Sequence, residues 1–547
     1  MNKLNLLVNY SLEIPENDDF WIIIDLFDKI DLNSYIKIKN YDGETRGRKG
    51  YSSRDLLAAI LFASMKNHTS LRDMESFFKY DIRCRYILDS NSPSHVTIGN
   101  FINNNLIENI ESIMVDLILA IKDFGVSIDL NTVYIDGSKI EAASNKYTWV
   151  WKNACLKFRD KMFTKISNRI PDLQANILDN YGLEIGVKEE YTIDDLENLI
   201  SFFETKKAEL DLVYVYSQGK RKTVFQRYHD EFISYLERLK TYSKKIAICG
   251  SSRNSYSKTD QDATFMRIKV DYMGNDSLLP AYNLQVAVSN CFIVHMDTYQ
   301  FASDSSTFIP FMNSFKENYG FYPKYPVGDA GYGSMTNLCF LEDNNIEKYI
   351  KFPMYKNHTK NKKYINDKFA VRNMKIDEFG NFICPNNKLL KFWKTKKIEG
   401  NQFERTTEMY KCDDCKLCPM RKECMKSKAE YYENKVVTLN KEMTKFHDEV
   451  IKNLASDRGV KCRVNRSIQA EGAFGDIKSN YGFDRVKRKS LKSVKFEMFL
   501  TCIGHNLRRF INILNDENQD ETTSFTDNLP KLIDNSFFDT SNISIQL

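Results

Sequence analysis

Apolar residues at helical spacing dominate the first part of the chain. They recur three and four positions apart after Ser52 and again after Ser70, which is the periodicity of one buried helix face. Ser52-x-x-Asp55 and Ser70-x-x-Asp73 each place a capping side chain ahead of such a run. We therefore predict a helical bundle over residues 1–130, either a DNA-binding unit of helix-turn-helix kind or a purely structural domain.

The first clear strand pattern begins at Val133. Val133 and Ile135 alternate with Tyr134, and Gly137 interrupts the run after Asp136, so we predict a short buried strand that ends on this carboxylate. An ionised Asp at such a position is costly to desolvate unless a cation or hydrogen-bond donors meet it. Taken alone, the simpler explanation is that Asp136 caps the following turn.

Two later acids occupy similar settings. The short strand pattern Tyr325–Val327 leads into Gly328 and Asp329, at the start of a glycine-rich turn. Glu471 lies in a late helical segment, and Lys478 follows it by two helical turns, so the two side chains should share one helix face. The recurrence of acids at element ends favours a functional site over three unrelated turns.

Changes in pattern along the chain predict a mixed α/β fold with insertions. The expected segments are a helical domain at 1–130, the first part of the core at 131–152, a helical insertion at 153–250, the core continued at 251–352, a basic cysteine-containing insertion at 353–460, the Glu471 helix closing the core at 461–514 and an acidic tail at 515–547.

Charge distribution is more informative than net charge. A formal charge of +5 over 547 residues does not by itself indicate a nucleic-acid partner. Basic clusters at Arg46–Lys49, Lys351–Lys363, Lys388–Lys397 and Arg485–Lys495 are typical of a phosphate-binding face and also of solvated helix faces. No apolar run approaches the roughly 18 residues of a membrane helix, and no secretory signal is evident. We expect a cytoplasmic protein with no membrane contact.

The chain has twelve cysteines, which in the cytoplasm are thiols rather than disulfides. Four of them follow the spacing Cys412-x2-Cys415-x2-Cys418-x5-Cys424, with Cys384 upstream. Thiolates two residues apart can bind one metal ion. Structural zinc and unliganded thiols are both open interpretations, and an iron–sulfur cluster fits less well because the last interval is wrong.

The three acids suggest a shared metal site. Strands that end at one sheet edge bring their last residues together, and a helix packed across the sheet can supply a third ligand. Three oxygen ligands suit Mg²⁺, two such ions can support phosphoryl transfer, and Lys478 would neutralise a phosphate oxygen. Other acids in the same region compete with Asp136, Asp329 and Glu471, the strongest being Asp297. The rivals are Asp260, Asp262, Asp297 and Asp304.

Taken together, these motifs resemble the DDE transposases of bacterial insertion sequences, close to the group conventionally numbered eleven eighty-two. The resemblance is carried by Asp136–Ala142, Gly328–Tyr332, Glu471–Lys478, the cysteines of Cys412–Cys424 and the helical stretch Tyr51–Phe101. It extends over nearly the whole chain. Each motif alone is weak, whereas their combination is specific.

One motif departs from the family pattern. Related transposases commonly carry Tyr-x2-Arg-x3-Glu-x6-Lys around the final acid. Here Val464 and Ser467 occupy the Tyr and Arg places, and Arg466 comes one residue early. Glu471 and Lys478 keep the family spacing, so the departure concerns the position of the DNA-contacting arginine alone.

The resemblance implies an RNase H-like core whose mixed sheet carries the catalytic acids Asp136, Asp329 and Glu471, assisted by Lys478. It implies two bound Mg²⁺ ions, with Mn²⁺ as a substitute, hydrolysis at terminal inverted repeats and joining of the 3′-OH ends to target double-stranded DNA by a homodimer. The residues expected to contact DNA are Lys139, Lys146, Arg466, Lys478, Arg485, Lys487 and Arg488.

Two alternatives remain open at this stage. One is a catalytically inactive DNA-binding protein derived from a transposase, against which the presence of all three acids argues. The other is an RNase H-like nuclease that cleaves DNA without joining it. Metal-dependent nicking would separate the first from a transposase, and a strand-transfer assay would separate the second.

Overall fold

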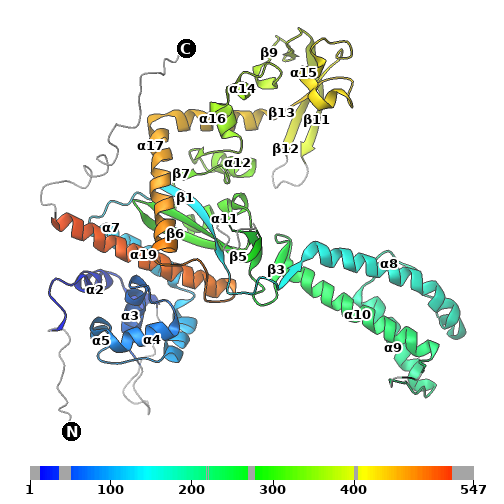
Figure 1. Cartoon of the computed structure of the whole chain (residues 1–547), viewed down its shortest axis with the longest axis horizontal. Coiled ribbons are helices and arrows are strands. Elements are labelled where there is room, and N and C mark those ends of the chain that lie inside the picture. Colours follow the sequence, from blue (N-terminus) through cyan, green and yellow to red (C-terminus); the bar gives the residue numbers. More distant parts are fainter. Residues whose placement is uncertain are drawn as a thin grey trace.

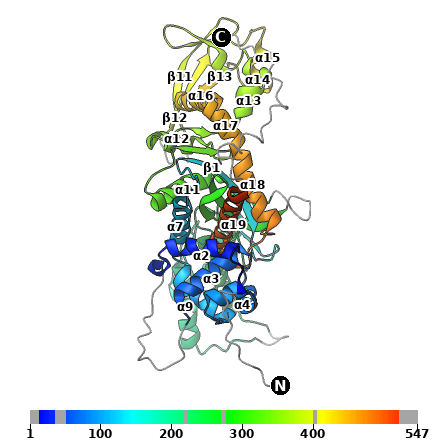
Figure 2. The ribbon, with the colours of Figure 1, turned by 90° about the vertical axis from the view of Figure 1, so that its left-hand side faces the viewer.

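The computed structural model describes residues 13–35, 51–216, 219, 221–268, 277–398 and 405–519. An α/β core lies at the centre, an N-terminal helical bundle lies on one side of it and a sheet-containing insertion on the opposite side, while a long helical arm projects sideways (Figure 1). In the view turned by 90°, the bundle, the core and the insertion follow one another from bottom to top (Figure 2). No helix within the described residues is both long and apolar enough to cross a lipid bilayer.

The N-terminal bundle has the caps that its sequence predicts. The Ser52 hydroxyl accepts the Asp55 N–H and the Ser70 hydroxyl accepts the Asp73 N–H, so both helices begin where expected. The described part of 1–123 is largely helical. The helices are α2 (Asp19–Lys29), α3 (Ser53–Met65), α4 (Leu71–Tyr80), α5 (Ile82–Ile87), α6 (His95–Phe101) and α7 (Ile110–Asp123).

A six-stranded mixed sheet forms the core. Strand β5 pairs antiparallel with β1 on one side and with both β4 and β6 on the other, while β7 pairs parallel with β1 and β8 parallel with β7. The sheet therefore joins segments from across the chain. The strands are β1 (Thr132–Glu141), β4 (Thr264–Arg267), β5 (Leu278–Ser289), β6 (Phe292–Tyr299), β7 (Tyr325–Gly328) and β8 (Tyr349–Ile350).

Strand β1 does not end at Asp136, so that part of the sequence prediction is wrong. The strand continues to Glu141 and pairs with β5 over its whole second half. Gly137 lies opposite Gln285, and a Cβ at Gly137 would sit 2.3 Å from Gln285 Nε2. The glycine therefore makes room for a side chain that crosses it, and it does not terminate the strand.

Helix α19 (Leu491–Gln519) closes the edge of the sheet. Its buried Asn506 accepts the Ile293 N–H of β6 at 2.8 Å and donates to the Ile293 carbonyl at 2.9 Å. This pair of hydrogen bonds replaces a neighbouring strand, and so leaves less free backbone at the edge. The remaining core helices are α11 (Asp304–Tyr319) and α12 (Met335–Asp343).

The predicted helical insertion forms the projecting arm. Within the described residues of this segment there are three α-helices, and they have their own core around Phe203 and Phe232. The helices are α8 (Lys152–Asn176), α9 (Ile193–Glu209) and α10 (Val224–Cys249).

The basic insertion at 353–460 is more regular than its sequence suggests. It contains a five-stranded antiparallel sheet in the order β13-β12-β11-β10-β9. Lysines interrupt the apolar alternation of its longest strands, which conceals them from pattern analysis. The strands are β9 (Lys375–Ile376), β10 (Phe382–Ile383), β11 (Leu389–Ile398), β12 (Arg405–Cys412) and β13 (Val436–Leu439).

The segment 461–514 is two helical units rather than one. Helix α16 (Lys441–Ala455) turns at Ser456 into α17 (Asp457–Arg466), which continues through further helical segments to Asn480. A loop then leads to α19. The predicted tail at 515–547 is helical to Gln519, and residues 520–547 lie outside the described part of the chain.

The N-terminal bundle packs directly on α19. A Cβ at Gly504 of α19 would lie 2.3 Å from the Ser64 carbonyl oxygen of α3, so the two helix backbones approach closely there. Arg508, one turn further along α19, donates to the Met65 carbonyl at 2.7 Å and stacks over Tyr481. The bundle is thus joined to the core through main-chain contacts that tolerate little extra volume.

Gly504→Ala should lower the free energy of unfolding by about 1–3 kcal/mol, because the added methyl group forces α3 and α19 apart. The thermal unfolding midpoint of the full chain measures the effect. Gly475→Ala is the matched control: Gly475 is also helical, and its added Cβ would meet nothing within 4 Å. Equal midpoints for the two variants would contradict the tight helix contact.

Candidate active site

Asp136 lies in the middle of the sheet, near the end of β7. Its side chain is about one-fifth exposed. The parallel register pairs Thr132 with Tyr325 and Tyr134 with Val327. Extended past the end of β7, the same register brings Asp136 opposite Asp329. Parallel strands are about 5 Å apart, so Asp329, the residue after the end of β7, follows that strand toward the side of Asp136.

Asp329 is the first residue of a tight turn that packs against the end of the next strand, β8. The Gly331 N–H donates to Asp329 Oδ1 at 2.8 Å. A Cβ at Gly333 would lie 2.1 Å from the Lys351 carbonyl oxygen, so the turn can approach the end of β8 only with glycine there. The position of Asp329 is therefore fixed by backbone contacts as well as by its strand.

Glu471 reaches the same region from a helix with an unusual turn. Helix α17 continues into the π-helical segment η6 (Ser467–Glu471), then α18 (Gly472–Gly475) and η7 (Asp476–Asn480). In a π-helical turn, hydrogen bonds join residues five apart. Arg466 and Glu471, which are five residues apart, therefore lie on the same face of the helix. A regular α-helix, in which hydrogen bonds join residues four apart, would not place them on one face. Such turns are frequent at functional sites.

Arg466 links two of the three predicted acids. Its Nη1 lies 3.8 Å from Asp136 Oδ1 and its Nη2 lies 3.9 Å from Glu471 Oε1. The arginine that appears one residue early in the sequence is thus placed beside both carboxylates by the π-helical turn. The guanidinium is mostly buried, and its Nη1 has no hydrogen-bond partner among the described residues.

A basic cleft adjoins the Asp329 turn. It has a volume of about 460 Å³ and is lined by Ala330, Lys351 and Arg463 together with other residues of 352–360. Burial, together with the neighbouring charges of Arg466 and Arg463, lowers the pKa of Lys351. Arg463 Nε is buried and has no hydrogen-bond partner among the described residues. Sequence reasoning placed Lys351 in the basic cluster Lys351–Lys363 but did not connect it with the acids, because it lies outside their motifs.

A polar network supports the site from the other face of the sheet. Asp304, the first residue of α11, accepts hydrogen bonds from Lys139 at 2.5 Å, Asn283 at 2.9 Å and Gln285 at 3.2 Å. The Tyr332 hydroxyl in turn donates to Gln285. Lys139 is thereby committed to Asp304, which argues against its predicted DNA contact. Asp304, a rival acid in the sequence, instead supports the turn that carries Asp329.

Several carboxylates converge around Tyr332. Burial raises the pKa of its hydroxyl well above the ordinary value, and the charges of Asp304, Asp136 and Asp329 raise it further. A Cβ at Gly331 would lie 3.0 Å from Asp329 Oδ1 and 3.8 Å from Asp304 Oδ2, so these two carboxylates flank the turn. The site is an acidic region at the end of the interior strand β7, with basic groups around it.

The chemistry of the three carboxylates suits a divalent cation. Their present arrangement, however, does not form a metal site. Three carboxylates provide the oxygen donors that Mg²⁺ prefers. No group of three or more His, Cys, Asp or Glu side chains within the described residues is arranged to hold an ion. The guanidinium of Arg466 lies between Asp136 and Glu471, in the place where a shared cation would neutralise both.

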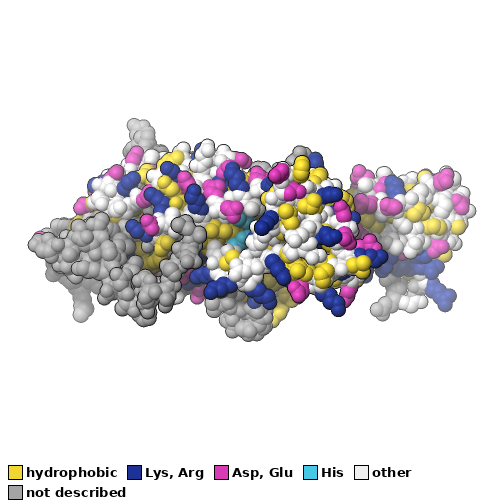
Figure 3. All heavy atoms as spheres, turned by 90° about the horizontal axis from the view of Figure 1, so that it is seen from above, with side chains coloured by type: hydrophobic (Ala, Val, Ile, Leu, Met, Phe, Trp, Pro, Cys, Tyr) yellow, Lys and Arg dark blue, Asp and Glu magenta, His cyan; other side chains and the backbone are white. Residues whose placement is uncertain are grey.

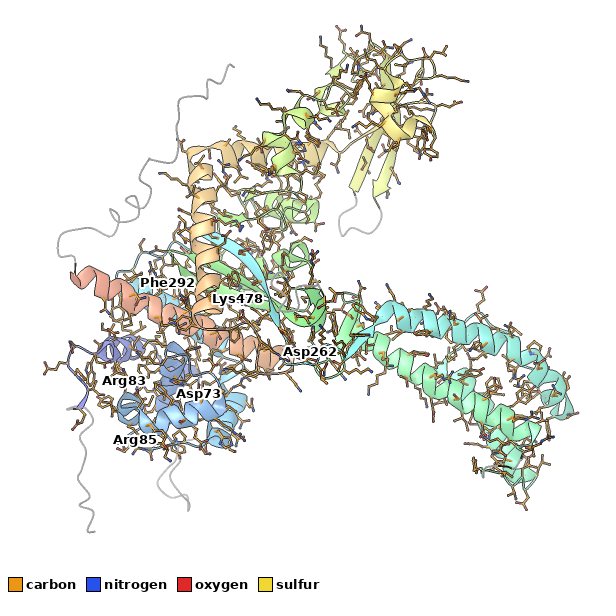
Figure 4. The ribbon with its side chains drawn as sticks, viewed as in Figure 1. Asp73, Arg83, Arg85, Asp262, Phe292 and Lys478 are labelled. Atoms are coloured by element: carbon orange, nitrogen blue, oxygen red, sulfur yellow. The ribbon has the colours of Figure 1, made fainter. Side chains whose placement is uncertain are left out.

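The other basic residues predicted to contact DNA divide into two groups. Lys478 lies beside β1 and donates to the Lys139 carbonyl at 3.4 Å (Figure 4). Arg485 is half exposed and donates to the Ala142 and Ser144 carbonyls. Lys478 therefore lies against the middle of β1, whereas Arg485 lies against the end of β1 and also pairs with Glu141 at 3.7 Å.

The remaining three of these basic residues have contacts elsewhere. Lys487 Nζ donates to the Thr69 hydroxyl at 3.0 Å. Arg488 stacks over Phe496, and burial lowers the pKa of its guanidinium. Lys146 lies over the exposed ring of Tyr147, at the base of the arm. Arg488 therefore stabilises the loop before α19, which argues against the predicted DNA contact.

The rival acids have structural partners. Asp297, the strongest rival, forms an ion pair with Lys495 at 3.0 Å. Asp260 accepts the Tyr282 hydroxyl at 2.8 Å and Asp262 accepts the Gln300 amide at 3.0 Å. These contacts account for their burial without a ligand.

The cysteines of the insertion gather around one small pocket. Cys384 joins the four predicted thiols Cys412, Cys415, Cys418 and Cys424 in its lining. The Lys435 N–H donates to Cys415 Sγ at 3.4 Å and the Lys388 N–H to Cys384 Sγ at 3.3 Å. Burial raises the pKa of the Cys412 thiol to about 12. At this same thiol a hydrogen bond from the Asp414 backbone N–H acts in the opposite direction and lowers the pKa of Cys412.

The helix that carries Glu471 is anchored at its far end. Asp476 Oδ2 lies 2.6 Å from His505 Nδ1, and His505 Nε2 donates to the Cys291 carbonyl at 3.0 Å. Burial alone would raise the pKa of Asp476, but hydrogen bonds from His505 and Asn480 outweigh it and the pKa is lowered. This pair ties η7 to α19 and to the β5–β6 turn.

Comparison with known proteins gives two family matches. Residues 383–511 match a family model described as a transposase DDE domain, and residues 9–104 match one described as a transposase domain (DUF772). The first range contains Glu471, Lys478 and all five cysteines that line the pocket; the second contains most of the N-terminal bundle. No curated protein and no solved structure matches the chain. The two matches support a transposase of insertion-sequence type.

Asp476→Asn should lower the thermal unfolding midpoint at pH 7 and much less near pH 3. The folded-state pKa of Asp476 lies below its unfolded value, so its stabilisation is complete above about pH 4 and is lost as pH falls through the folded pKa. Measuring both proteins across this range tests the sign. Asp484→Asn, an exposed neighbour, is the control, and a difference that grows on acidification would contradict the anchor.

Proposed function

We propose that this chain is a DDE transposase that cuts the terminal inverted repeats of an insertion sequence and joins the 3′-OH ends to target DNA. One observation carries the proposal: Asp136 and Glu471, hundreds of residues apart, flank the same guanidinium while Asp329 lies in register with Asp136. The two transposase family matches agree with it. Membership of the group numbered eleven eighty-two is part of the same proposal.

The order of the core strands supports an RNase H-like assignment. Strands β6, β5 and β1 form an antiparallel array, and β7 and β8 follow in parallel on the other side of β1. Asp136 lies on the central strand and Asp329 at the end of its parallel neighbour. In this interpretation the helical arm is an insertion between β1 and the next core strand.

Asp136, Asp329 and Glu471 would hold Mg²⁺ or Mn²⁺. The metal would supply activation of the attacking oxygen and stabilisation of the leaving oxygen. Arg466 must release at least one carboxylate for such binding, because one guanidinium and one divalent cation compete for the same charge. The guanidinium would then be free to contact a phosphate, the role that the sequence motif assigns to an arginine.

The basic groups around the acids suit a DNA backbone. Lys351 and Arg463 line the cleft beside Asp329, and Lys478 and Arg485 lie along β1 and its continuation. Cations so placed bind phosphates without reading bases, and so fix the register of a duplex. Cleavage at two element ends requires two such sites, which is the reason to propose a homodimer on double-stranded DNA.

The cysteine pocket is proposed as a structural zinc site. Five thiols line one pocket, and zinc needs four: Cys384 follows β10, Cys412 ends β12, Cys415 and Cys418 come after it, and Cys424 lies in the short helix α15 (Arg421–Met425). Backbone N–H groups already point at two of the sulfurs. Zinc would cross-link a small sheet whose own apolar core is limited.

Asp136→Asn should abolish metal-dependent cleavage of terminal-repeat DNA, a loss of about 10³-fold or more, because a neutral amide is a far poorer metal ligand. DNA binding in the absence of divalent metal should remain within a few-fold of the wild type. Strand cleavage is followed on labelled duplexes that carry the element ends.

Asp297→Asn is the matched control, since Asp297 is a rival acid on the same sheet that pairs with Lys495. If Asp136→Asn cleaves at the wild-type rate while Asp297→Asn does not, the assignment of the acids is wrong. Cleavage without any joined product would instead favour the nuclease alternative.

Purified wild-type chain should contain about one zinc ion, and Cys415→Ser combined with Cys418→Ser should remove it and lower the unfolding midpoint. Elemental analysis after anaerobic preparation gives the metal content. Cys291→Ala is the control, because Cys291 lies outside the pocket. Full-length protein without zinc or iron would leave these residues as packing thiols.

A further inference from the structure

Strands β11 and β12 present an exposed aromatic ring that the core of the insertion does not use. Trp393 is 47% exposed. It occupies a β-bulge, because the register with β12 shifts between Phe392 and Lys394. A bulge turns a side chain away from the regular alternation of the strand, and bulges of this kind are enriched at functional positions.

Two lysines flank the Trp393 ring. Lys394 Nζ lies 4.2 Å and Lys411 Nζ 5.5 Å from its centroid. An aromatic face beside two ammonium groups offers stacking for a base and charge for the phosphates on either side of it.

The sheet face around Trp393 is rich in lysine. The pairs that share this face are Lys391 with Lys411, Lys394 with Met409 and Lys396 with Thr407. No acidic side chain lies on this face within the described residues of the two strands, since Glu408 faces the other side and binds Lys441.

Like charges directly opposite each other weaken a sheet. Lys391 and Lys411 are the lysines that lie directly opposite each other on this face, and Asp413, 3.6 Å from Lys391, offsets part of their repulsion. Lys394 and Lys396 lie opposite the uncharged Met409 and Thr407, so their ammonium groups add positive charge to the face without a direct cross-strand partner.

The surroundings agree with a partner that carries both charge and flat apolar surface. On the molecular face viewed from above, Lys and Arg side chains are interspersed with hydrophobic and with acidic ones (Figure 3). The five-stranded sheet and the helical arm both project from the core on the same side (Figure 1). Duplex exteriors expose phosphates but few base faces, whereas unpaired DNA exposes both.

We propose that β11 and β12 bind an unpaired stretch of DNA, with one base stacked on Trp393 and the phosphates beside it on Lys394, Lys396 and Lys411. This inference rests on the proposed transposase function for its choice of DNA. The proposed contact would bind strand ends that are opened during cleavage. Strands β11 and β12 belong to a different sheet from the strands that lead to Asp136 and Asp329.

The test uses the full chain without divalent metal and oligo(dT) as the probe. Wild-type fluorescence should be quenched on binding, and Trp393→Ala should raise Kd about 5- to 100-fold, the range expected for one stacked base. Trp393→Phe keeps an aromatic face and should stay within about threefold of the wild type. Lys396→Ala should reduce the slope of log K against log salt by about one.

Trp149→Ala is the matched control, since Trp149 is similarly exposed at 45% but lies beside Phe265 at the base of the arm. Equal Kd values for Trp393→Ala and wild type, or equal quenching by polyphosphate and by oligo(dT), would overturn the stacking contact. If the Trp393 variants behave as expected but wild-type protein cleaves no DNA, the proposed function fails and the binding surface stands. Intact cleavage with unchanged Trp393→Ala binding would remove the stacking contact and leave the proposed function in place.

Discussion

The gathering of carboxylates around one guanidinium is the constraint on which the site depends. Pairing β7 alongside β1 brings Asp329 toward Asp136, and the helix after α17 adds Glu471. Like charges at this spacing need a cation nearby. Arg466 provides one, and the π-helical turn after it is what allows a single guanidinium to approach both Asp136 and Glu471.

The rest of the core holds these elements in register. Because Gly137 has no side chain, the side chain of Gln285 can pass over β1 and form hydrogen bonds with Tyr332 and Asp304. Gly333 lets the Asp329 turn contact the end of β8. Gly137 and Gly333, which have no side chains, therefore help to determine where Asp136 and Asp329 lie. Both glycines act by allowing close packing and not through charge.

The insertions extend the reach of the molecule away from this centre. The arm has its own apolar core, and the five-stranded sheet combines a cysteine pocket with a basic, aromatic face. Each is small and projecting, so each needs internal stabilisation of its own. Helices α16 and α17 connect the sheet directly to the segment that carries Glu471, which couples the position of the insertion to the site.

Sequence alone determined the features that depend on local chemistry: the helical bundle with its Ser caps, the short strand that leads to Asp329, the cysteine spacing and the resemblance that singled out three acids. Tertiary structure decided the rest. The length of β1 depends on Gln285, a partner far along the chain, and the placement of Arg466 depends on a π-helical turn that no residue pattern indicates. Likewise, Lys139 and Arg488 are basic in sequence but bound to Asp304 and Phe496 in the fold. Packing between distant segments decides which charged side chains remain available to a ligand. The sequence pattern alone does not show this packing.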